Sequence, residues 1–184
     1  MNHPTTPLLL PASTLVGIGS DSQALTAKLD LEVYAAEGAT QQVCIVVTPP
    51  APLHFAASTE EDLEDAKTLI TDVVHSLQSA VTKFREQGVA HGSIAVLLPS
   101  KAVLGEASSV LPGLVGGAVL SLCRTIAIEL KKDSVSLNTV LHGDFSVAEC
   151  AAIASLLHVF RCNPALTGQE IFTADGPNLG RIKP

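Results

Sequence analysis

Two pairs of side chains in this sequence could move protons or act as nucleophiles. Ser100 and Lys101 follow one apolar run, and a serine beside a lysine can be an activated nucleophile. His142 and Asp144 follow a second apolar run, and a histidine beside an aspartate can be a general base. Neighbouring residues at the end of a strand point in different directions, and no nucleophile is placed with the histidine. We therefore expect neither pair to be catalytic.

The groups that could bind a metal ion show no metal-site spacing. Acidic residues between positions 60 and 65 follow a serine and a threonine, which is typical of the first turn of a solvated helix. The cysteines show no C-x-x-C spacing, and each lies in or beside an apolar segment, as reduced thiols do: Cys44, Cys123, Cys150 and Cys162. We predict no metal site.

The composition indicates one soluble globular domain. Of 184 residues, 47% are hydrophobic and 16% are charged, with one Tyr and no Trp, so the core must consist mainly of aliphatic side chains. The net charge of -7 and the scattered Lys and Arg residues argue against nucleic acid as a partner. The N-terminal segment lacks a basic region, and no apolar run approaches about 18 residues, so we expect a cytoplasmic protein without membrane contact.

Apolar runs alternate along the chain with segments of helical periodicity. The runs predict strands at 8–10, 31–35, 43–47, 93–98, 135–141 and 170–176. Apolar residues at helical spacing predict helices at 58–87, 113–132 and 146–160, and a turn followed by a helix at 17–29. Strands that alternate with crossover helices indicate an α/β fold, with a mainly parallel, doubly wound sheet and helices on both faces.

Three strings in this order resemble the second half of the short-chain dehydrogenases/reductases: GSIAVLL, GGAVLSLCRTIAIELKKDSVSLNTVLHG and ALTGQEIFTADGPN. The resemblance covers about residues 43–178 and, more weakly, 8–29. It implies a truncated Rossmann-like fold in a single domain over 1–184. Residues 1–42 would be a shortened remnant of the nucleotide-binding half, and 43–184 would carry the oligomerisation helices.

The resemblance also implies that the family's catalytic residues are missing. Members use a serine, a tyrosine and a lysine, with an asparagine that relays protons, and the lysine lowers the pKa of the tyrosine beside the nicotinamide. Aligned to these strings, the serine, tyrosine, lysine and asparagine positions hold Pro99, Pro112, Gly116 and Ile70. None of these side chains transfers protons, although Ser100 stands next to the serine position.

The family's cofactor motif is present in part. Members have a turn of the form T-G-x-x-x-G-I-G, whose glycines let the backbone approach the pyrophosphate. Gly17 and Gly19 match this motif, but Ala12 and Ser13 replace the leading threonine and glycine. Only 28 residues separate Gly19 from Thr48, about half of what the family uses to build its second and third strands. We therefore expect no bound NAD or NADP and treat the two glycines as vestiges.

The helices that the family uses for assembly match well. In the family, the helices corresponding to 58–87 and 107–131 pack against the same helices of a neighbour, and the helix at 146–160 forms a second interface with the last strand. The apolar residues of 113–130 surround most of that helix, which is more than one sheet face can cover. We expect a dimer or tetramer with these interface residues: Leu69, Val73, Leu77, Gly113, Gly117, Ala118, Leu122 and Ile126.

These features lead to the hypothesis of a pseudoenzyme, a non-catalytic subunit that assembles with and stabilises an active paralogue, or assembles with itself. Members with one degenerate subunit are known, as in the 2-(hydroxybenzyl)succinyl-CoA dehydrogenase of anaerobic toluene degradation, and the resemblance implies such a subunit. Two alternatives stay open. One is an oxidoreductase acting on a hydroxyacyl-CoA or other carbonyl compound through relocated residues, and the other is a small-ligand sensor on a vestigial Rossmann fold.

Overall fold

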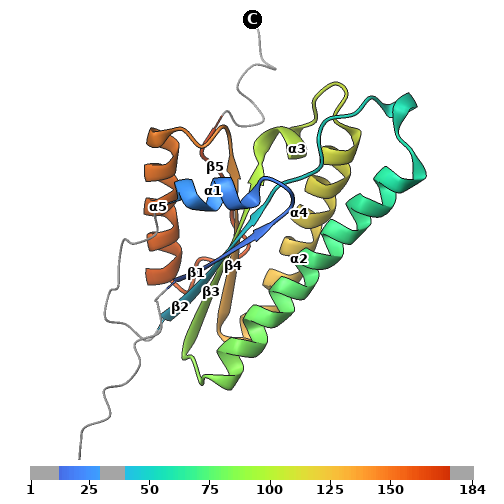
Figure 1. Ribbon diagram of the computed structural model, residues 1–184. Helices are drawn as coiled ribbons and strands as arrows, with labels where there is room; N and C mark the ends of the chain where they lie inside the picture. The colour runs from blue at the N-terminus through green and yellow to red at the C-terminus, as the bar shows by residue number, and fades with distance from the viewer. Residues whose placement is uncertain (1–12, 30–39, 175–184) are drawn as a thin grey trace, which may run out of the picture.

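The computed structural model describes residues 13–29 and 40–174, which form a parallel sheet between two layers of helices (Figure 1). The sheet has the order β1-β2-β3-β4-β5, and its strands are β1 (Ser13–Ile18), β2 (Thr40–Val47), β3 (His91–Pro99), β4 (Val135–His142) and β5 (Glu170–Phe172). The predicted α/β class, with helices on both faces, is confirmed. The strands predicted at 8–10 and 31–35 lie outside the described residues.

The helices divide between the two faces of the sheet. They are α1 (Ser22–Lys28), α2 (Glu60–Glu86), α3 (Ser100–Leu104), α4 (Val110–Leu130) and α5 (Val147–Cys162). Side chains of α1 and α5 share one apolar cluster with one face of the sheet, and side chains of α2 and α4 share another with the opposite face (Figure 1). The sequence missed α3, which begins where β3 ends, because five residues are too few to show helical periodicity.

The central strands are covered on both faces, as their continuous apolar sequences predict. Ile45 and Val47 pack under α2 and α4, whereas Cys44 and Val46 pack under α1 and α5, and all four are fully buried. Burial raises the pKa of the Cys44 thiol to about 12, so this cysteine is a neutral apolar group in the core.

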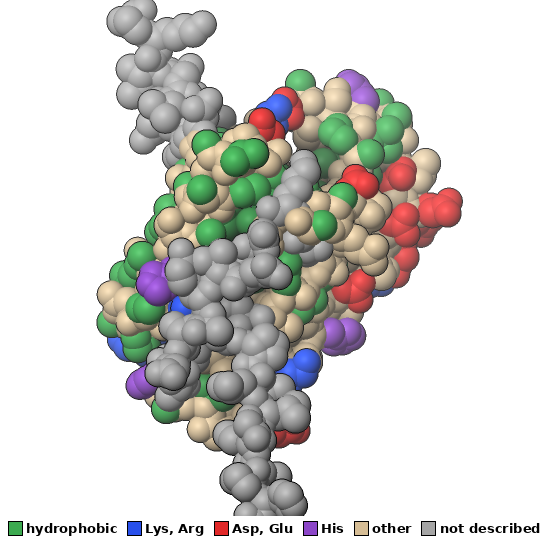
Figure 2. All heavy atoms as spheres, turned by 60° about the vertical axis from the view of Figure 1, so that its left-hand side comes forward, with side chains coloured by type: hydrophobic (Ala, Val, Ile, Leu, Met, Phe, Trp, Pro, Cys, Tyr) green, Lys and Arg blue, Asp and Glu red, His purple; other side chains and the backbone are tan. Residues whose placement is uncertain are grey.

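The long helix α2 forms for the reasons that its sequence suggests. Thr59 caps its first turn: the Thr59 hydroxyl accepts from the Asp62 amide at 3.2 Å, and the Asp62 carboxylate accepts from the Thr59 amide at 2.8 Å. Acidic side chains gather on the surface at this end of the helix (Figure 2), as the solvated first turn predicts. The buried residues recur at helical spacing and face the sheet: Ala66, Val73, Leu77, Ala80, Val81 and Phe84. Past the end of α2, Gly88 has φ 61°, a left-handed conformation that favours glycine.

One expectation about α4 was wrong, because its apolar stretch does reach about 18 residues. An 18-residue window within Val110–Asp133 has a mean hydropathy of 1.7, so by length and composition this helix could span a bilayer. Other elements of the chain bury more of the α4 surface than expected, because α3 packs beside this helix, and the sheet and α2 lie under it. The buried side chains include Val115, Val119 and Leu130, while Leu114 and Ile128 remain 44% and 79% exposed.

The sheet connections pass over both faces. All strands are parallel, and each pairs with the next along the chain. The β2–β3 connection runs through α2 on one face, whereas the β4–β5 connection runs through α5 on the other. Because both connections move in the same direction across the sheet, they have opposite hands, although right-handed crossovers strongly predominate in proteins.

Candidate ligand site at the carboxyl edge of the sheet

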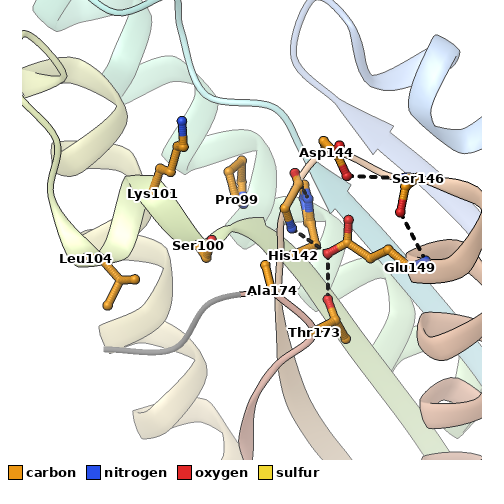
Figure 3. Close-up of a pocket in the computed structure, with 11 residues that line it drawn as sticks. Pro99, Ser100, Lys101, Leu104, His142, Asp144, Ser146, Glu149, Thr173 and Ala174 are labelled. Atoms are coloured by element: carbon orange, nitrogen blue, oxygen red, sulfur yellow. Dashed lines mark hydrogen bonds between the residues drawn. The ribbon is translucent and has the colours of Figure 1, made fainter. Parts of the chain in front are cut away.

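A cavity of about 580 Å³ opens where β3, β4 and β5 end, the edge at which open parallel sheets place their ligands (Figure 3). Its walls come from the start of α3, the loop between β4 and α5, and the residues after β5. The lining side chains with polar groups are Ser100, Lys101, His142, Asp144, Ser146, Glu149 and Thr173. Both pairs that the sequence singled out therefore lie around one cavity.

His142 is held as a neutral acceptor. Its side chain is 2% exposed, and its ring packs edge-on against Phe145 with centroids 4.1 Å apart. Nδ1 lies 3.0 Å from the carbonyl oxygen of Gly143, which can only accept, so Nδ1 carries the hydrogen and donates. Burial, partly opposed by this bond and by the nearby charge of Glu149, lowers the pKa of His142 to about 4. Nε2 is therefore an unprotonated acceptor, and it has no hydrogen-bond partner within the ranges 13–29 and 40–174.

Glu149 organises the loop between β4 and α5. Its carboxylate accepts from the backbone amides of Gly143 and Phe145 and from the Thr173 hydroxyl, the latter two at 2.8 and 2.9 Å. Phe145 has φ 55°, which a non-glycine residue adopts only with support from its surroundings. With these bonds made, the Glu149 carboxylate acts as a structural clamp. No sequence signal indicated this role, because Glu149 looks like an ordinary acid in a first helical turn.

Ser100 and Lys101 do not form a catalytic pair. Ser100 is buried at the start of α3, whereas Lys101 is largely exposed and forms a surface ion pair with Glu106 at 3.3 Å. Asp144 accepts from the Ser146 amide at 3.1 Å. Among the described residues, no hydrogen bond joins His142 to Ser100 or to Asp144, so the cavity contains no assembled nucleophile and base.

The position that the resemblance aligns with the family's lysine, Gly116, has no room for a side chain. A Cβ atom built on Gly116 would lie 2.9 Å from both the Cβ atom and the carbonyl oxygen of Ala102, so α3 occupies the space that a lysine would need. Pro112 is buried in α4, Pro99 lines the cavity, and Ile70 is half-buried on α2. None of these positions presents a group that could exchange a proton.

The two glycines that match part of the cofactor motif serve local packing. Gly17 belongs to β1 rather than to a turn, which differs from the expectation, and a Cβ atom there would lie 2.8 Å from the Ser22 hydroxyl. Gly19 has φ 102°, and a Cβ atom there would clash with the carbonyl oxygen of Thr48. The Ser22 hydroxyl donates to the Gly19 carbonyl at 2.7 Å. Both glycines therefore allow β1, the turn and the end of β2 to pack closely.

The residues expected at a subunit interface divide between the core and the surface. Val73 and Leu77 are buried in the cluster between α2 and the sheet, so they support the helix from inside. Gly117 is exposed, and the others are half-buried: Leu69, Gly113, Ala118, Leu122 and Ile126. The surface available to a partner is therefore narrower than the sequence suggested, and most of it lies on α4.

No protein-family model matches the sequence, and no curated protein matches it either. Solved structures do match its fold. An acetoin dehydrogenase from Salmonella typhimurium has a TM-score of 0.70 at 16% identity, with 91% of this chain and 87% of that chain covered. A putative oxidoreductase from Escherichia coli K-12 has a TM-score of 0.63 at 19% identity, with 86% and 83% covered.

A third match is an acetoin dehydrogenase from Enterobacter cloacae, with a TM-score of 0.65 at 20% identity, and coverage of 78% of this chain and 66% of that chain. At these identities the similarity concerns the fold. The parallel strands and the two helical layers of this chain agree with the fold that the resemblance in the sequence implies. In its fold, the chain is a Rossmann-like α/β protein that resembles these solved dehydrogenase structures.

Proposed function

We propose that this chain is a non-catalytic member of the short-chain dehydrogenase/reductase family that assembles with, and stabilises, an active paralogue. The observation that carries the proposal is the contact between α3 and α4. Gly116 stands at the lysine position, and Ala102 fills the adjoining space to within 2.9 Å of a Cβ atom there. A subunit without room for this lysine would act through contacts with other subunits and not through catalysis.

The outer surface of α2 and α4 supports the assembly part of the proposal. Leu63 is 47% exposed on α2, and Leu114 and Ile128 are exposed on α4. Between the two helices lies a groove of about 250 Å³ whose walls include Val74 and Ile126. Apolar surface of this kind is usual in the centre of a permanent interface, which commonly buries on the order of 2,000 Å² or more.

Gly117 provides a sharp test of this interface. It is exposed on α4, and a Cβ atom built there meets no described atom within 4 Å, so the isolated subunit tolerates a side chain at this position. We expect Gly117→Glu to dissociate the assembly, because it places an unpaired charge in an apolar contact. Gly117→Ala, which makes the same backbone change without the charge, should leave the assembly intact.

The experiment is light scattering on the chain alone and co-expressed with an active dehydrogenase paralogue from the same genome. The expected species are larger than the 19.0 kDa monomer for wild type and Gly117→Ala, and smaller for Gly117→Glu. The paralogue's thermal midpoint should rise in the presence of the wild-type chain. A monodisperse monomer that leaves the thermal midpoint of the paralogue unchanged would refute the proposal.

The cytoplasmic location expected from the sequence stays a prediction.

A further inference from the structure

The two edges of the described sheet differ in their protection against pairing with another strand. At one edge, β5 has only three residues, and Arg124 of α4 binds the carboxylate of its first residue, Glu170. Short edge strands and charged side chains are usual means by which proteins prevent such pairing. At the other edge, β1 has six residues, Ser13–Ile18, without a charge or a proline, and its register with β2 contains no bulge. β1 therefore has the properties of a strand that pairs with a further strand.

The backbone groups on the outer side of β1 come from alternate residues. The Thr48 amide donates to the Ile18 carbonyl oxygen at 2.8 Å, so the backbone groups of Ile18 point toward β2. Because this direction alternates along a strand, Leu15 and Gly17 point their N–H and C=O groups away from β2. No strand within residues 13–29 and 40–174 pairs with that side, and Gly17 is exposed. These groups can therefore bond to a strand of another molecule.

A groove of about 320 Å³ lies beside β1 on the face of the sheet that α2 covers. Thr14 and Val16 of β1 line one side of the groove, and Ser79 and Lys83 of α2 line the other. Thr14 is exposed and Val16 is half-buried, so α2 covers this edge only in part. Because side chains alternate along a strand, a strand added beside β1 would direct every second side chain toward this groove.

The charges along α2 favour a second copy of this chain as the source of that strand. Asp72, Ser76, Ser79 and Lys83 recur at helical spacing, and the last three line the groove. Asp72 and Lys83 are exposed, and neither forms an ion pair with another described residue. A two-fold axis at the sheet edge makes the two α2 helices antiparallel, so Asp72 of each copy lies toward Lys83 of the other.

We propose that β1 pairs with β1 of a second copy in an antiparallel, two-fold symmetric arrangement that continues the sheet from one molecule into the other. With Leu15 opposite the same residue of the second copy, Gly17 lies opposite Ser13. In the same register Val16 lies opposite Thr14 at the groove, and pairs of β-branched side chains stabilise antiparallel strands. This contact uses a different side of α2 from the groove between α2 and α4, so it is independent of the assembly proposed above.

The test is amide hydrogen exchange at Leu15 and Gly17, measured by NMR on the full chain over a range of protein concentrations. The chain carries Gly117→Glu throughout, because this change is expected to prevent the separate assembly through α4. We expect exchange at both amides to slow about tenfold once the protein concentration exceeds the dissociation constant about tenfold, because only the paired copy is protected. Light scattering on the same samples should show a dimer of the 19.0 kDa chain that increases with concentration.

A charge added at the proposed contact should prevent the pairing. Thr14 is exposed, so the isolated chain tolerates Thr14→Lys, whereas in the dimer this lysine would lie beside Val16 of the second copy. We expect this variant to lose the concentration-dependent protection. Thr71→Lys makes the same change on the exposed surface of α2 and should retain it.

A charge reversal tests the two-fold arrangement of the α2 helices. Lys83→Glu should raise the dissociation constant about tenfold, because two weak ion pairs are each replaced by a repulsion. Asp72→Lys combined with Lys83→Glu exchanges the two charges and should restore the affinity.

Four results would overturn the proposal. Rapid exchange of both amides at every concentration would show that the edge stays open, and equally slow exchange at every concentration would show that the chain covers its own edge. The proposal also fails if Thr14→Lys dimerises as Thr71→Lys does, or if the double variant dimerises no better than Lys83→Glu alone.

Discussion

Gly116 has a packing role that depends on its lack of a side chain. This absence lets Ala102 of α3 approach α4 closely. Its neighbour Gly117 is exposed, and a methyl added there would meet no atom of the described chain. Two adjacent glycines on one helix therefore have different roles, and only the structure distinguishes them.

The two glycines predict opposite responses to the same substitution. Gly117→Ala should raise the free energy of unfolding by about 0.5–1 kcal/mol, because it removes backbone freedom from a helix interior without a clash. Gly116→Ala should lower it by about 1–2 kcal/mol, because the added methyl forces α3 away from α4 and this outweighs the gain in helix propensity. Urea unfolding of both variants measures the difference. Equal stabilisation by both would mean that α3 moves freely.

His142 predicts a loss of stability in weak acid. Its pKa is lowered from 6.5 to about 4 in the folded state, so below pH 6.5 the unfolded chain takes up a proton that the folded chain refuses. The free energy of unfolding should therefore fall by about 1.4 kcal/mol per pH unit, to a total of about 3 kcal/mol at pH 4, and should be unaffected by this group above pH 6.5. Urea unfolding of wild type and His142→Phe across this range isolates the effect, since the variant lacks the titrating ring. The prediction would be wrong if the free energy of unfolding depended on pH in the same way in wild type and in His142→Phe.

At the scale of elements, the loop between β4 and α5 depends on one side chain. The Glu149 carboxylate accepts the amides of Gly143 and Phe145 and the hydroxyl of Thr173, so it joins the end of β4, the start of α5 and the segment after β5. In this way one helical residue determines the shape of the loop that presents His142 to the cavity.

Removal of this clamp should loosen the cavity edge. We expect Glu149→Ala to lower the free energy of unfolding by about 3 kcal/mol, because buried donors lose a charged acceptor. Glu129→Ala removes the same kind of side chain from an exposed position of α4 and should have an effect within about 0.5 kcal/mol. Urea unfolding measures both, and the exchange of the Gly143 and Phe145 amide hydrogens should accelerate in Glu149→Ala alone. Matching results for the two variants would show that the loop is held by other contacts.

Most of the elements could be predicted from the sequence, but most of the site could not. Long apolar runs indicated β2, β3 and β4, and the capped amphipathic stripe indicated α2, because these patterns arise from burial and local hydrogen bonding. Register between parallel strands depends on packing between distant segments, so the sequence did not show that Pro99 lies beside His142. For the same reason, the sequence predicted neither the hydrogen-bond donors to Glu149 nor the contact of Ala102 with Gly116.

For the whole molecule, the resemblance implies that the family's catalytic groups and glycine turn are altered, so we expect a protein that does not use a nicotinamide cofactor. In the described sheet, β1 lies at one edge, next to β2 alone. The turn that follows β1 is packed by Ser22 and by the Thr48 carbonyl, which leaves the glycines engaged with their own chain.

Calorimetry checks this expectation directly. We expect no saturable heat when NAD, NADH, NADP or NADPH is titrated into the isolated chain, since the leading glycine of the motif is replaced by Ser13. The matched positive control is an active short-chain dehydrogenase under the same conditions. Micromolar affinity for any of the four would support the alternative of an oxidoreductase with relocated residues.

The order of the strands also bears on how the chain acquires its structure. Each described strand pairs with the next one along the sequence, so each chain segment between paired strands is as short as the parallel arrangement allows. Shorter loops between pairing segments cost less entropy to close, which favours faster folding than in sheets whose strands pair out of sequence. We therefore expect the sheet to form in one direction, from β1 towards β5, as successive strands are synthesised.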